Sequence, residues 1–493
     1  MLIAMEVAAY HLADGRVDTL RFSTGGFITR PTDTPANAWF EPVIKQAPSL
    51  ERVLFDDSAT YGATKATIGN VLLLNEDGGL DALLTDYAFD GRRFTVRLGE
   101  PETPYAQWLV VMTGTLSDVA AQDGGIELVI QDRLADLTSI DWPTYAGSNV
   151  APNGLEGTAS DLKDQPKPRV YGAVLNVSPK AVNTSKLIWQ ASDSSCTIAA
   201  AYDNGVALTR GADYASTDDM QATAPGAGEF RCFGGYLRLG SSPAGTVTCD
   251  AQGPVTRAAD LLVAIARDAG VPDDDIVQAD VDALNALSTA PVGVWVDSSE
   301  TPQSLMDTIA ASVGAWYGFD RLSRLRMGRL DAPDGEPVAT YGQDVQETLE
   351  PRSGGIPAWS VSVRHARNYT VQNNVAGAAG VARSTWLVQE YRTAAATDAS
   401  VRVPWPHAQA LVFDTGLTQS GDASAEAQRR LTLYGVRRMT LDVDIPVTEL
   451  DTVDLGDVVA LVTPRYGLSG RRFRVVGINS GFASGRAALV LWG

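Results

Sequence analysis

The sequence predicts a mainly β, multidomain protein with α+β insertions, in which two related small β-barrels flank a β-rich unit and an α+β unit. Three observations predict this class. The chain has 493 residues, which at roughly 100–200 residues per domain corresponds to about three to four domains. Short apolar or alternating runs between Gly-containing turns recur at both ends of the chain, as in β-strands. Clear helical periodicity is limited to residues 256–314 and 422–434.

Residues 1–140 are predicted to form the N-terminal barrel. A hairpin is expected at Asp14-Gly15, because an Asp-Gly pair between apolar runs favours a tight turn. Leu80 to Leu84 could supply one helical turn. The expected strands are 10–12, 17–22, 93–98, 108–112 and 126–130.

Residues 141–252 are predicted to form a β-rich accessory unit. Its start is marked by the Trp142-Pro143 turn and by the Pro-rich passage 163–168. The unit carries all three cysteines of the chain. The expected strands are 186–190, 197–202, 236–239 and 245–249.

Residues 253–345 are predicted to form the α+β unit. The first helix is expected over 256–270, with Thr256 as N-cap and Gly270 as the stop. The second is expected over 301–314, with Thr301 as N-cap and a proline at its first position. Strand 292–296 precedes the second helix, and a hairpin of 316–319 with 325–330 follows it.

Residues 346–493 are predicted to form the C-terminal barrel. A helix is expected over 422–434, capped by Asp422, with Arg429 and Arg430 outside its apolar stripe. Residues 376–381 read as a small-residue loop. The expected strands are 360–364, 385–391, 440–445, 457–462, 473–478 and 487–491.

The two ends of the chain share one order of turns and strands. Near the N-terminus, Asp90-Gly91 leads into a strand, a linker, a second strand, a Gly-containing turn and a third strand that ends near residue 130. Near the C-terminus, Leu455-Gly456 leads through the same order of strands and turns to residue 491. Few residues are identical, and any two small antiparallel barrels share such an order, so both common architecture and a true repeat remain open.

Composition and charge exclude several classes of function. With 39 Lys and Arg against 59 Asp and Glu, the net charge is −20, which argues against binding the phosphates of DNA or of anionic lipid. This charge either lines an acidic conduit, for example at the turns 118–123 and 451–457, or keeps a large chain soluble. No apolar run approaches the roughly 20 residues of a membrane span. The N-terminus lacks a basic leader, so synthesis in the cytoplasm is expected.

Residues able to perform chemistry are few, and the sequence assigns no catalytic, cofactor-binding or metal-binding residue. None of His11, His365 and His407 has a Cys or His at ligand spacing, which favours structural roles. A Ser-His-Asp triad has no Gly-x-Ser-x-Gly turn to support it. The acids 273–275 do not match a calcium loop and suit the start of a helix. The three cysteines could meet, but they are one ligand short of the usual iron–sulfur set, so buried thiols are the preferred interpretation.

Nine stretches of the chain carry a resemblance through their order: 29–40, 75–83, 86–93, 167–177, 201–206, 238–249, 456–459, 465–468 and 473–476. Together they resemble the baseplate hub (tail tip) family of tailed phages and related prophages. The resemblance covers nearly the whole chain, and its specificity lies in the order of the pieces.

This resemblance implies a structural virion protein rather than an enzyme. Such hubs are trimers in which each chain contributes two related barrels, so that three chains present six barrels to the sixfold tail tube. The implied partners are the distal tail protein or tube, the central fibre or spike and the tape measure protein, with phage DNA passing through unspecifically. The implied location is the tail baseplate of the virion. A distal tail ring, a receptor-binding tip subunit and a tail-associated cell-wall hydrolase remain as alternatives.

Overall fold

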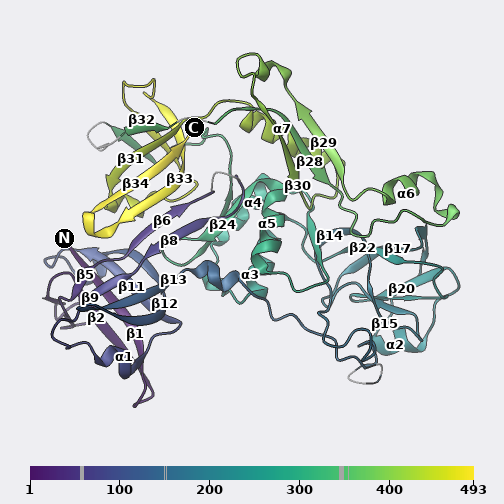
Figure 1. Ribbon diagram of the computed structural model, residues 1–493, viewed down its shortest axis with the longest axis horizontal. Helices are drawn as coiled ribbons and strands as arrows, with labels where there is room; N and C mark the ends of the chain where they lie inside the picture. The colour runs from purple at the N-terminus through teal and green to yellow at the C-terminus, as the bar shows by residue number, and fades with distance from the viewer. Residues whose placement is uncertain (56–59, 149, 151–152, 343–348, 353–354) are drawn as a thin grey trace.

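The computed structural model describes residues 1–55, 60–148, 150, 153–342, 349–352 and 355–493. Strands hold 40% of the residues and helices 19%, which confirms the predicted mainly β, multidomain class. Two large sheets lie together at one end of the molecule, helices occupy the centre, and a β-rich unit forms the other end (Figure 1). No helix in the described part of the chain has the length and apolarity needed to cross a membrane.

The N-terminal barrel sheet has eight strands in the order β10-β1-β11-β12-β13-β9-β5, with β2 paired to β1. The predicted Asp14-Gly15 hairpin is confirmed, because Gly15 has a φ of +65° between β1 and β2. The predicted helical turn is the short helix α1 (Ala82–Thr85). The strands are β1 (Leu2–His11), β2 (Arg16–Ser23), β5 (Ile44–Gln46), β9 (Val71–Leu74), β10 (Tyr87–Ala88), β11 (Arg92–Gly99), β12 (Leu109–Gln122) and β13 (Gly125–Gln131).

The C-terminal barrel sheet has six strands from the end of the chain in the order β26-β32-β33-β34-β31-β27. Two strands from the N-terminal region complete it, since β6 (Ser49–Val53) pairs with β33 and β8 (Lys65–Gly69) pairs with β6. Its other strands are β26 (Ala339–Gly342), β27 (Leu349–Arg352), β31 (Thr440–Pro446), β32 (Val458–Val462), β33 (Arg471–Gly481) and β34 (Arg486–Trp492).

The two barrel sheets repeat one hydrogen-bonding plan. β12 and β13 pair over Thr115 and Leu116, shift register at Ser117, and then pair over five residues to the turn. β33 and β34 pair over Arg474 and Val475, shift register at Val476, and again pair over five residues. A β-bulge at the same distance from the turn is a specific feature of a strand pair. Common architecture alone does not require it, so the match favours a true repeat.

The glycines that open the two repeats also correspond. Gly91 and Gly456 have φ angles of +67° and +88°, a region that favours glycine. The N–H of Gly91 donates to the carbonyl of Leu116 at 2.9 Å, and the N–H of Gly456 donates to the equivalent Val475 at 2.8 Å. This one bond fixes the turn that leads into β11 and β32.

Side-chain volume is exchanged between the repeats at one cross-strand pair. In the N-terminal sheet Phe94 faces Gly114, where a Cβ atom would lie 2.9 Å from the phenyl ring. At the equivalent pair, Val459 faces Phe473, so the aromatic ring stands on the other strand. Each pair places one phenylalanine opposite a smaller residue, because close-packed cores penalise both voids and overlap. At this pair the shared plan is kept although the residues on both strands differ.

One continuous apolar core joins the two sheets. It includes Val96 and Leu116 from the first, Val475 and Leu491 from the second, and Trp316 from the central unit, all buried. The sheets therefore exclude water together, and neither buries its inner face alone.

The accessory unit packs two five-stranded sheets against each other. One has the order β18-β17-β22-β14-β23 and the other β15-β16-β21-β20-β19. A short helix that the sequence did not predict, α2 (Thr217–Ala222), begins at the N-cap Ser216. The strands are β14 (Arg169–Val177), β15 (Lys180–Asn183), β16 (Ile188–Gln190), β17 (Thr197–Asp203), β18 (Val206–Ala207), β19 (Thr209–Arg210), β20 (Glu229–Phe233), β21 (Tyr236–Leu239), β22 (Val247–Gln252) and β23 (Gly293–Val296).

The central unit contains α3 (Ala258–Asp268), α4 (Gln278–Leu287) and α5 (Pro302–Val313), with the hairpin of β24 (Ala315–Phe319) and β25 (Leu325–Arg329). α5 is confirmed in detail, since Thr301 caps it and Gly314 ends it at φ +69°. Thr256 as the cap of α3 is wrong, because Arg257 occupies that position. α4 was not predicted.

The segment 358–434 packs on the central helices. Its sheet has the order β29-β28-β30, with strands β28 (Ala358–His365), β29 (Arg392–Thr397) and β30 (Gln409–Asp414). α7 (Ser420–Tyr434) packs on β28 and β29, and its apolar side chains share one core with α3 and α5. This core crosses the expected ranges 253–345 and 346–493, and the boundary at 345 lies outside the described residues. The fourfold division stays a prediction.

Two expectations for this segment are wrong. The expected strand 385–391 and the end of the expected loop 376–381 hold the helix α6 (Gly380–Leu387). On this helix Arg383 lies 3.8 Å from the ring centroid of Tyr202 and donates to Asn176 at 2.8 Å, so contacts with the accessory unit accompany a helix where the local pattern favours a strand. The expected cap Asp422 lies inside the first turn of α7, where Gln419 is the N-cap.

Arg430 was placed outside the apolar stripe of α7, yet its side chain is fully buried. The helix is covered both by the β28 sheet and by α5, so a position off the stripe still faces protein. The guanidinium donates to the carbonyl of Ala311 on α5 and pairs with Glu426 at 2.6 Å. It also lies 4.0 Å from the ring centroid of Phe413.

Candidate functional site at the junction of the barrel sheets

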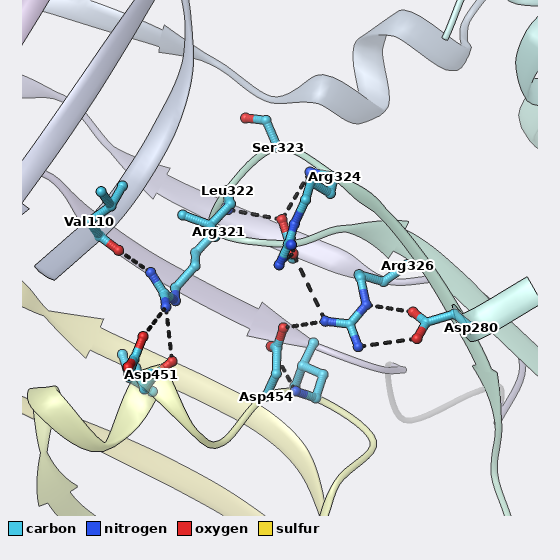
Figure 2. Close-up of polar contacts among 12 residues, drawn as sticks. Val110, Asp280, Arg321, Leu322, Ser323, Arg324, Arg326, Asp451 and Asp454 are labelled. Atoms are coloured by element: carbon cyan, nitrogen blue, oxygen red, sulfur yellow. Dashed lines mark hydrogen bonds and ion pairs between the residues drawn. The ribbon is translucent and has the colours of Figure 1, made fainter. Parts of the chain in front are cut away.

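A loop of the central unit, residues 320–324 between β24 and β25, inserts between the two barrel sheets (Figure 2). Asp320 organises this loop, because its Oδ1 accepts from the backbone N–H groups of Leu322 and Arg324, both at 2.9 Å. An aspartate that bonds the backbone two residues ahead is a common means of closing a turn. Ser323 completes the turn with a φ of +60°.

The loop is bonded to β12 of the N-terminal sheet. The N–H of Thr113 donates to the carbonyl of Arg321 at 2.9 Å, and the hydroxyl of Ser323 donates to the carbonyl of Thr113 at 2.7 Å. The guanidinium of Arg321 donates to the carbonyl of Val110. The loop thus satisfies backbone groups on the same strand that carries the repeated bulge.

Arginines also bond this region to the turn 450–457 of the C-terminal sheet. Arg321 donates to the carbonyl of Leu450 at 3.1 Å. Arg326, on β25, donates to Asp454 at 3.1 Å and to Asp280 at 2.5 Å. Asp454 also accepts from Arg52 of β6 at 2.6 Å, so β6, β25 and the turn 450–457 meet at one carboxylate.

The charges at this junction are partly withdrawn from water. Burial acts to raise the pKa of Asp454, but Arg52, the N–H of Leu455 and Arg326 together outweigh it, and the pKa is lower than usual. Burial lowers the pKa of Arg321 and raises that of Asp457. Charge-assisted hydrogen bonds of this kind are about twice as strong as neutral ones and fix geometry. The junction can therefore hold three units in one orientation.

The acids 451–457, expected to line a conduit, divide between two roles. Asp451 has a side chain 68% exposed, 3.8 Å from Arg321, and can act on the surface field. Asp454 is a structural ion-pair partner, which contradicts a conduit-facing role for it. Asp118, in the other expected stretch, is exposed on β12.

The junction residues gave no local signal in the sequence. Arg52 and Asp454 are 402 positions apart, and neither belongs to a motif. Arg321 and Arg326 stand in an ordinary hairpin between a strand pair that the sequence did predict. Only paired substitutions across homologous sequences could have linked them.

The histidines stand on separate elements. His11, on β1, packs edge to face on Tyr87 with ring centroids 5.0 Å apart. His407 is exposed in a turn before β30. His365 is buried at the end of β28, where burial and Arg392 lower its pKa, and its Nδ1 has no hydrogen-bond partner among the described residues. The histidine of a Ser-His-Asp triad donates a hydrogen bond from Nδ1 to a carboxylate, whereas the Nδ1 of His365 makes no such bond among the described residues.

The acids 273–275 form a short 3₁₀ helix, η3 (Asp273–Asp275), rather than the start of an α-helix. Arg133 binds Asp275 at 2.8 Å, and Arg267 binds Asp273 at 2.6 Å. Across the described ranges, no group of three or more His, Cys, Asp or Glu side chains is placed to hold a metal ion.

The three cysteines belong to the accessory unit and are free thiols. Cys232 and Cys249 are buried in its apolar core, and Cys196 packs against it. Burial raises the pKa of Cys196 and Cys232 to about 12 and that of Cys249 well above its usual value. Because the thiolate is the reactive form of a cysteine, thiols with raised pKa values react slowly in the folded chain.

We expect Cys232 and Cys249 to resist iodoacetamide at pH 8 in the folded protein, because only an accessible thiolate reacts. Intact-mass measurement over time checks this, and all three cysteines should react after unfolding in urea. Rapid modification of Cys249 in the native protein, or iron at one equivalent or more, would contradict the expectation.

Solved structures similar to this chain include tail proteins of phage origin. A prophage MuSo2 43 kDa tail protein from Shewanella oneidensis is 12% identical over 100% of this chain and 98% of that chain, with a TM-score of 0.44. A tail protein from Neisseria meningitidis is 10% identical over 99% of this chain and 96% of that chain, with a TM-score of 0.42. A chain from the virion of a native gene transfer agent particle is 13% identical over 67% of this chain and 85% of that chain, with a TM-score of 0.45.

A scan of protein-family models finds no match, and neither does a search of curated proteins. At these identities and TM-scores the structural likeness is too low to transfer a function to this chain.

Proposed function

We propose that this chain is a structural subunit of a phage-type tail, and specifically a trimeric baseplate hub joining a sixfold tail tube to a threefold tip. The observation that carries the proposal is the repeated bulge register of β12–β13 and β33–β34. One chain then presents two equivalent sheets, and three chains present six. The resemblance of nine sequence stretches to the hub family supports the same role.

The junction supplies the rigidity that such a subunit needs. A hub transmits force between two rings, so its two sheets must keep one relative orientation. The shared apolar core and the arginine contacts to Val110, Leu450 and Asp454 supply that constraint. In this proposal phage DNA passes through without specific binding, as the net charge of −20 favours. Neighbours would be the distal tail protein or tube, the central fibre and the tape measure protein.

We expect three copies of the chain in an assembled tail tip and in a reconstituted complex. Native mass spectrometry of the complex, together with quantitative protein stoichiometry of purified particles, measures this number. Six copies would favour the distal tail ring instead, and a terminal location on a fibre would favour a receptor-binding subunit. Bacterial cell-wall hydrolysis by the purified chain would contradict the non-enzymatic role.

A further inference from the structure

A cavity of about 520 Å³ lies where the end of α7 and the segment that follows β25 approach the C-terminal sheet. Small-molecule sites commonly have volumes of roughly 300–1,000 Å³, so this cavity is large enough for a ligand. Its charged and apolar lining comes from four separate parts of the chain and includes Asp331 and Asp334 after β25, Arg429 and Leu433 on α7, Arg438 before β31, and Arg474 on β33.

Arg438 lines this cavity without a polar partner. Its guanidinium lies 5.0 Å from the ring centroid of Trp492. Its Nε is buried and makes no hydrogen bond, and no other hydrogen bond or ion pair of this guanidinium occurs in the described part of the chain. Withdrawing a charged donor from water without a partner costs free energy. Burial accordingly lowers the pKa of Arg438, and Asp334, which acts in the opposite direction, does not offset this effect.

Arg474 brings a second charge that no carboxylate neutralises. Its guanidinium donates to backbone carbonyls, those of Asp331 at 3.0 Å, Ala332 at 3.2 Å and Gly456. Among the described residues, no carboxylate oxygen lies within ion-pair distance of it. Carbonyl oxygens accept hydrogen bonds but carry no net charge, and burial lowers the pKa of Arg474. The cavity therefore holds two guanidinium groups that lack a counter-ion.

The sequence around these arginines supplies no acid that could neutralise them. Residues 427–441 contain four arginines and no Asp or Glu, and residues 458–493 contain five arginines and again no acid. Of the two aspartates that line the cavity, Asp331 is already paired with Arg329 and with Arg429, both at 2.9 Å. A locally positive site thus exists in a chain whose net charge is −20.

The charges of the lining specify the class of ligand. The three arginines and two aspartates of the lining give it a net charge of +1. One carboxylate balances this charge, whereas a phosphate dianion would exceed it and would meet both aspartates. The planar guanidinium of Arg438 also matches the two oxygens of a carboxylate. A monocarboxylate is therefore the anion that this cavity suits best.

Two further features indicate that a peptide carries the carboxylate. Leu433 and Ala332 give the cavity an apolar part, which suits an aliphatic group beside the anion. Asp334 is exposed, and its carboxylate accepts no hydrogen bond within the described residues, so it is available to an amide N–H. A carboxylate, an aliphatic group and an amide N–H occur together in a peptide.

We propose that this cavity binds one carboxylate of a peptide, presented by an acidic side chain or by the chain end of a neighbouring protein. Arg438 is the principal donor, because its guanidinium has no hydrogen bond to give up. Arg474 keeps its three carbonyl partners and contributes its charge. The inference does not rest on the proposed hub, since it concerns one chain whatever the number of copies.

Two small probes represent the two sources of the carboxylate. N-acetyl-leucine represents a chain end, and the α-amide of N-acetyl-glutamic acid represents an acidic side chain. N-acetyl-leucinamide is the matched neutral compound. Titration calorimetry on the full chain should show at least one acid binding about tenfold or more tightly than the neutral amide, because a charge-assisted hydrogen bond is lost without the carboxylate. The tighter acid identifies the source. Tighter binding of inorganic phosphate than of both acids, or saturable binding of neither acid, would overturn the proposal.

Arg438→Gln tests the assigned donor, because glutamine retains N–H groups but no charge. The matched control is Arg437→Gln. Arg437 is the preceding residue, is exposed, lies 5.3 Å from the ring centroid of Trp405 and does not line the cavity. Arg438→Gln should weaken the better probe about tenfold or more, and Arg437→Gln less than about twofold. Equal effects of the two substitutions would show a general field of positive charge and would overturn the site.

Thermal unfolding separates binding from folding. Because Arg438 makes no hydrogen bond within the described chain, Arg438→Gln without probe should unfold at the wild-type temperature or above it. The better probe should raise the unfolding temperature of wild type with increasing concentration, because it binds only the folded chain, and should leave that of Arg438→Gln unchanged. A lower unfolding temperature of Arg438→Gln without probe would show that the arginine maintains the fold, and would overturn its assignment to a ligand.

Discussion

Replacing Asp454 by alanine is expected to lower the free energy of unfolding by about 3–5 kcal/mol, the range for breaking a buried ion pair. The carboxylate accepts from Arg52 and Arg326, and the Arg52 side chain is only 4% exposed. Without Asp454, the buried guanidinium of Arg52 loses that compensating charge while it stays out of water. Urea unfolding followed by tryptophan fluorescence measures the loss.

The matched control is Asp451→Ala, in the same turn. Its side chain is 68% exposed and 3.8 Å from Arg321, so the expected change is within about 0.5 kcal/mol. Equal effects of the two substitutions would show that Asp454 contributes no more than a surface charge.

The stabilisation by Asp454 should also depend on pH in a defined direction. Its folded pKa lies below the usual 3.8, because Arg52, the N–H of Leu455 and Arg326 together outweigh the effect of burial. The contribution is therefore fully present above pH 3.8 and is lost as the pH falls through the folded pKa. Wild type should lose more stability than Asp454→Ala over that acidic range, and parallel pH profiles would contradict this.

Replacing Glu426 by leucine should cost a similar amount, about 3–5 kcal/mol, by isolating the fully buried Arg430. Glu426 accepts from Arg430 at 2.6 Å and from Arg429 at 2.7 Å. Arg429 keeps a second carboxylate, Asp331 at 2.9 Å, whereas Arg430 keeps the carbonyl of Ala311 and the ring of Phe413.

The double variant Glu426→Leu with Arg430→Met is the control for this prediction. Replacing a buried pair by apolar residues of similar volume is often neutral, so the double variant should recover most of the loss. Thermal unfolding of Glu426→Leu, Arg430→Met and the double variant beside wild type measures the coupling between the two sites. A double variant no more stable than Glu426→Leu would show that the cost comes from packing rather than from the isolated charge.

The sequence was sufficient at several positions where structure depends on neighbours along the chain, although the expected caps Thr256 and Asp422 are wrong. The hairpin at Gly15, the cap Thr301 and the stop Gly314 follow from backbone preferences of single residues, and all are observed. The matched order near Gly91 and Gly456 was visible as well, because turns require particular residues. The bulge register behind it was not visible, since Phe94–Gly114 and Val459–Phe473 exchange their volumes between strands.

Tertiary structure alone decided what lies between the units. Residues 385–391 alternate like a strand, but contacts of Arg383 with Tyr202 and Asn176 of the accessory unit accompany a helix there. The helical pattern places Arg430 at the surface of α7, but α5 covers that face and Arg430 donates to the carbonyl of Ala311 on it. Likewise β6 and β8 join a sheet whose remaining strands begin nearly 300 residues later, at β26. Local sequence sets φ and ψ preferences, whereas the burial of a charge or the pairing of an edge depends on which distant surface excludes water from it.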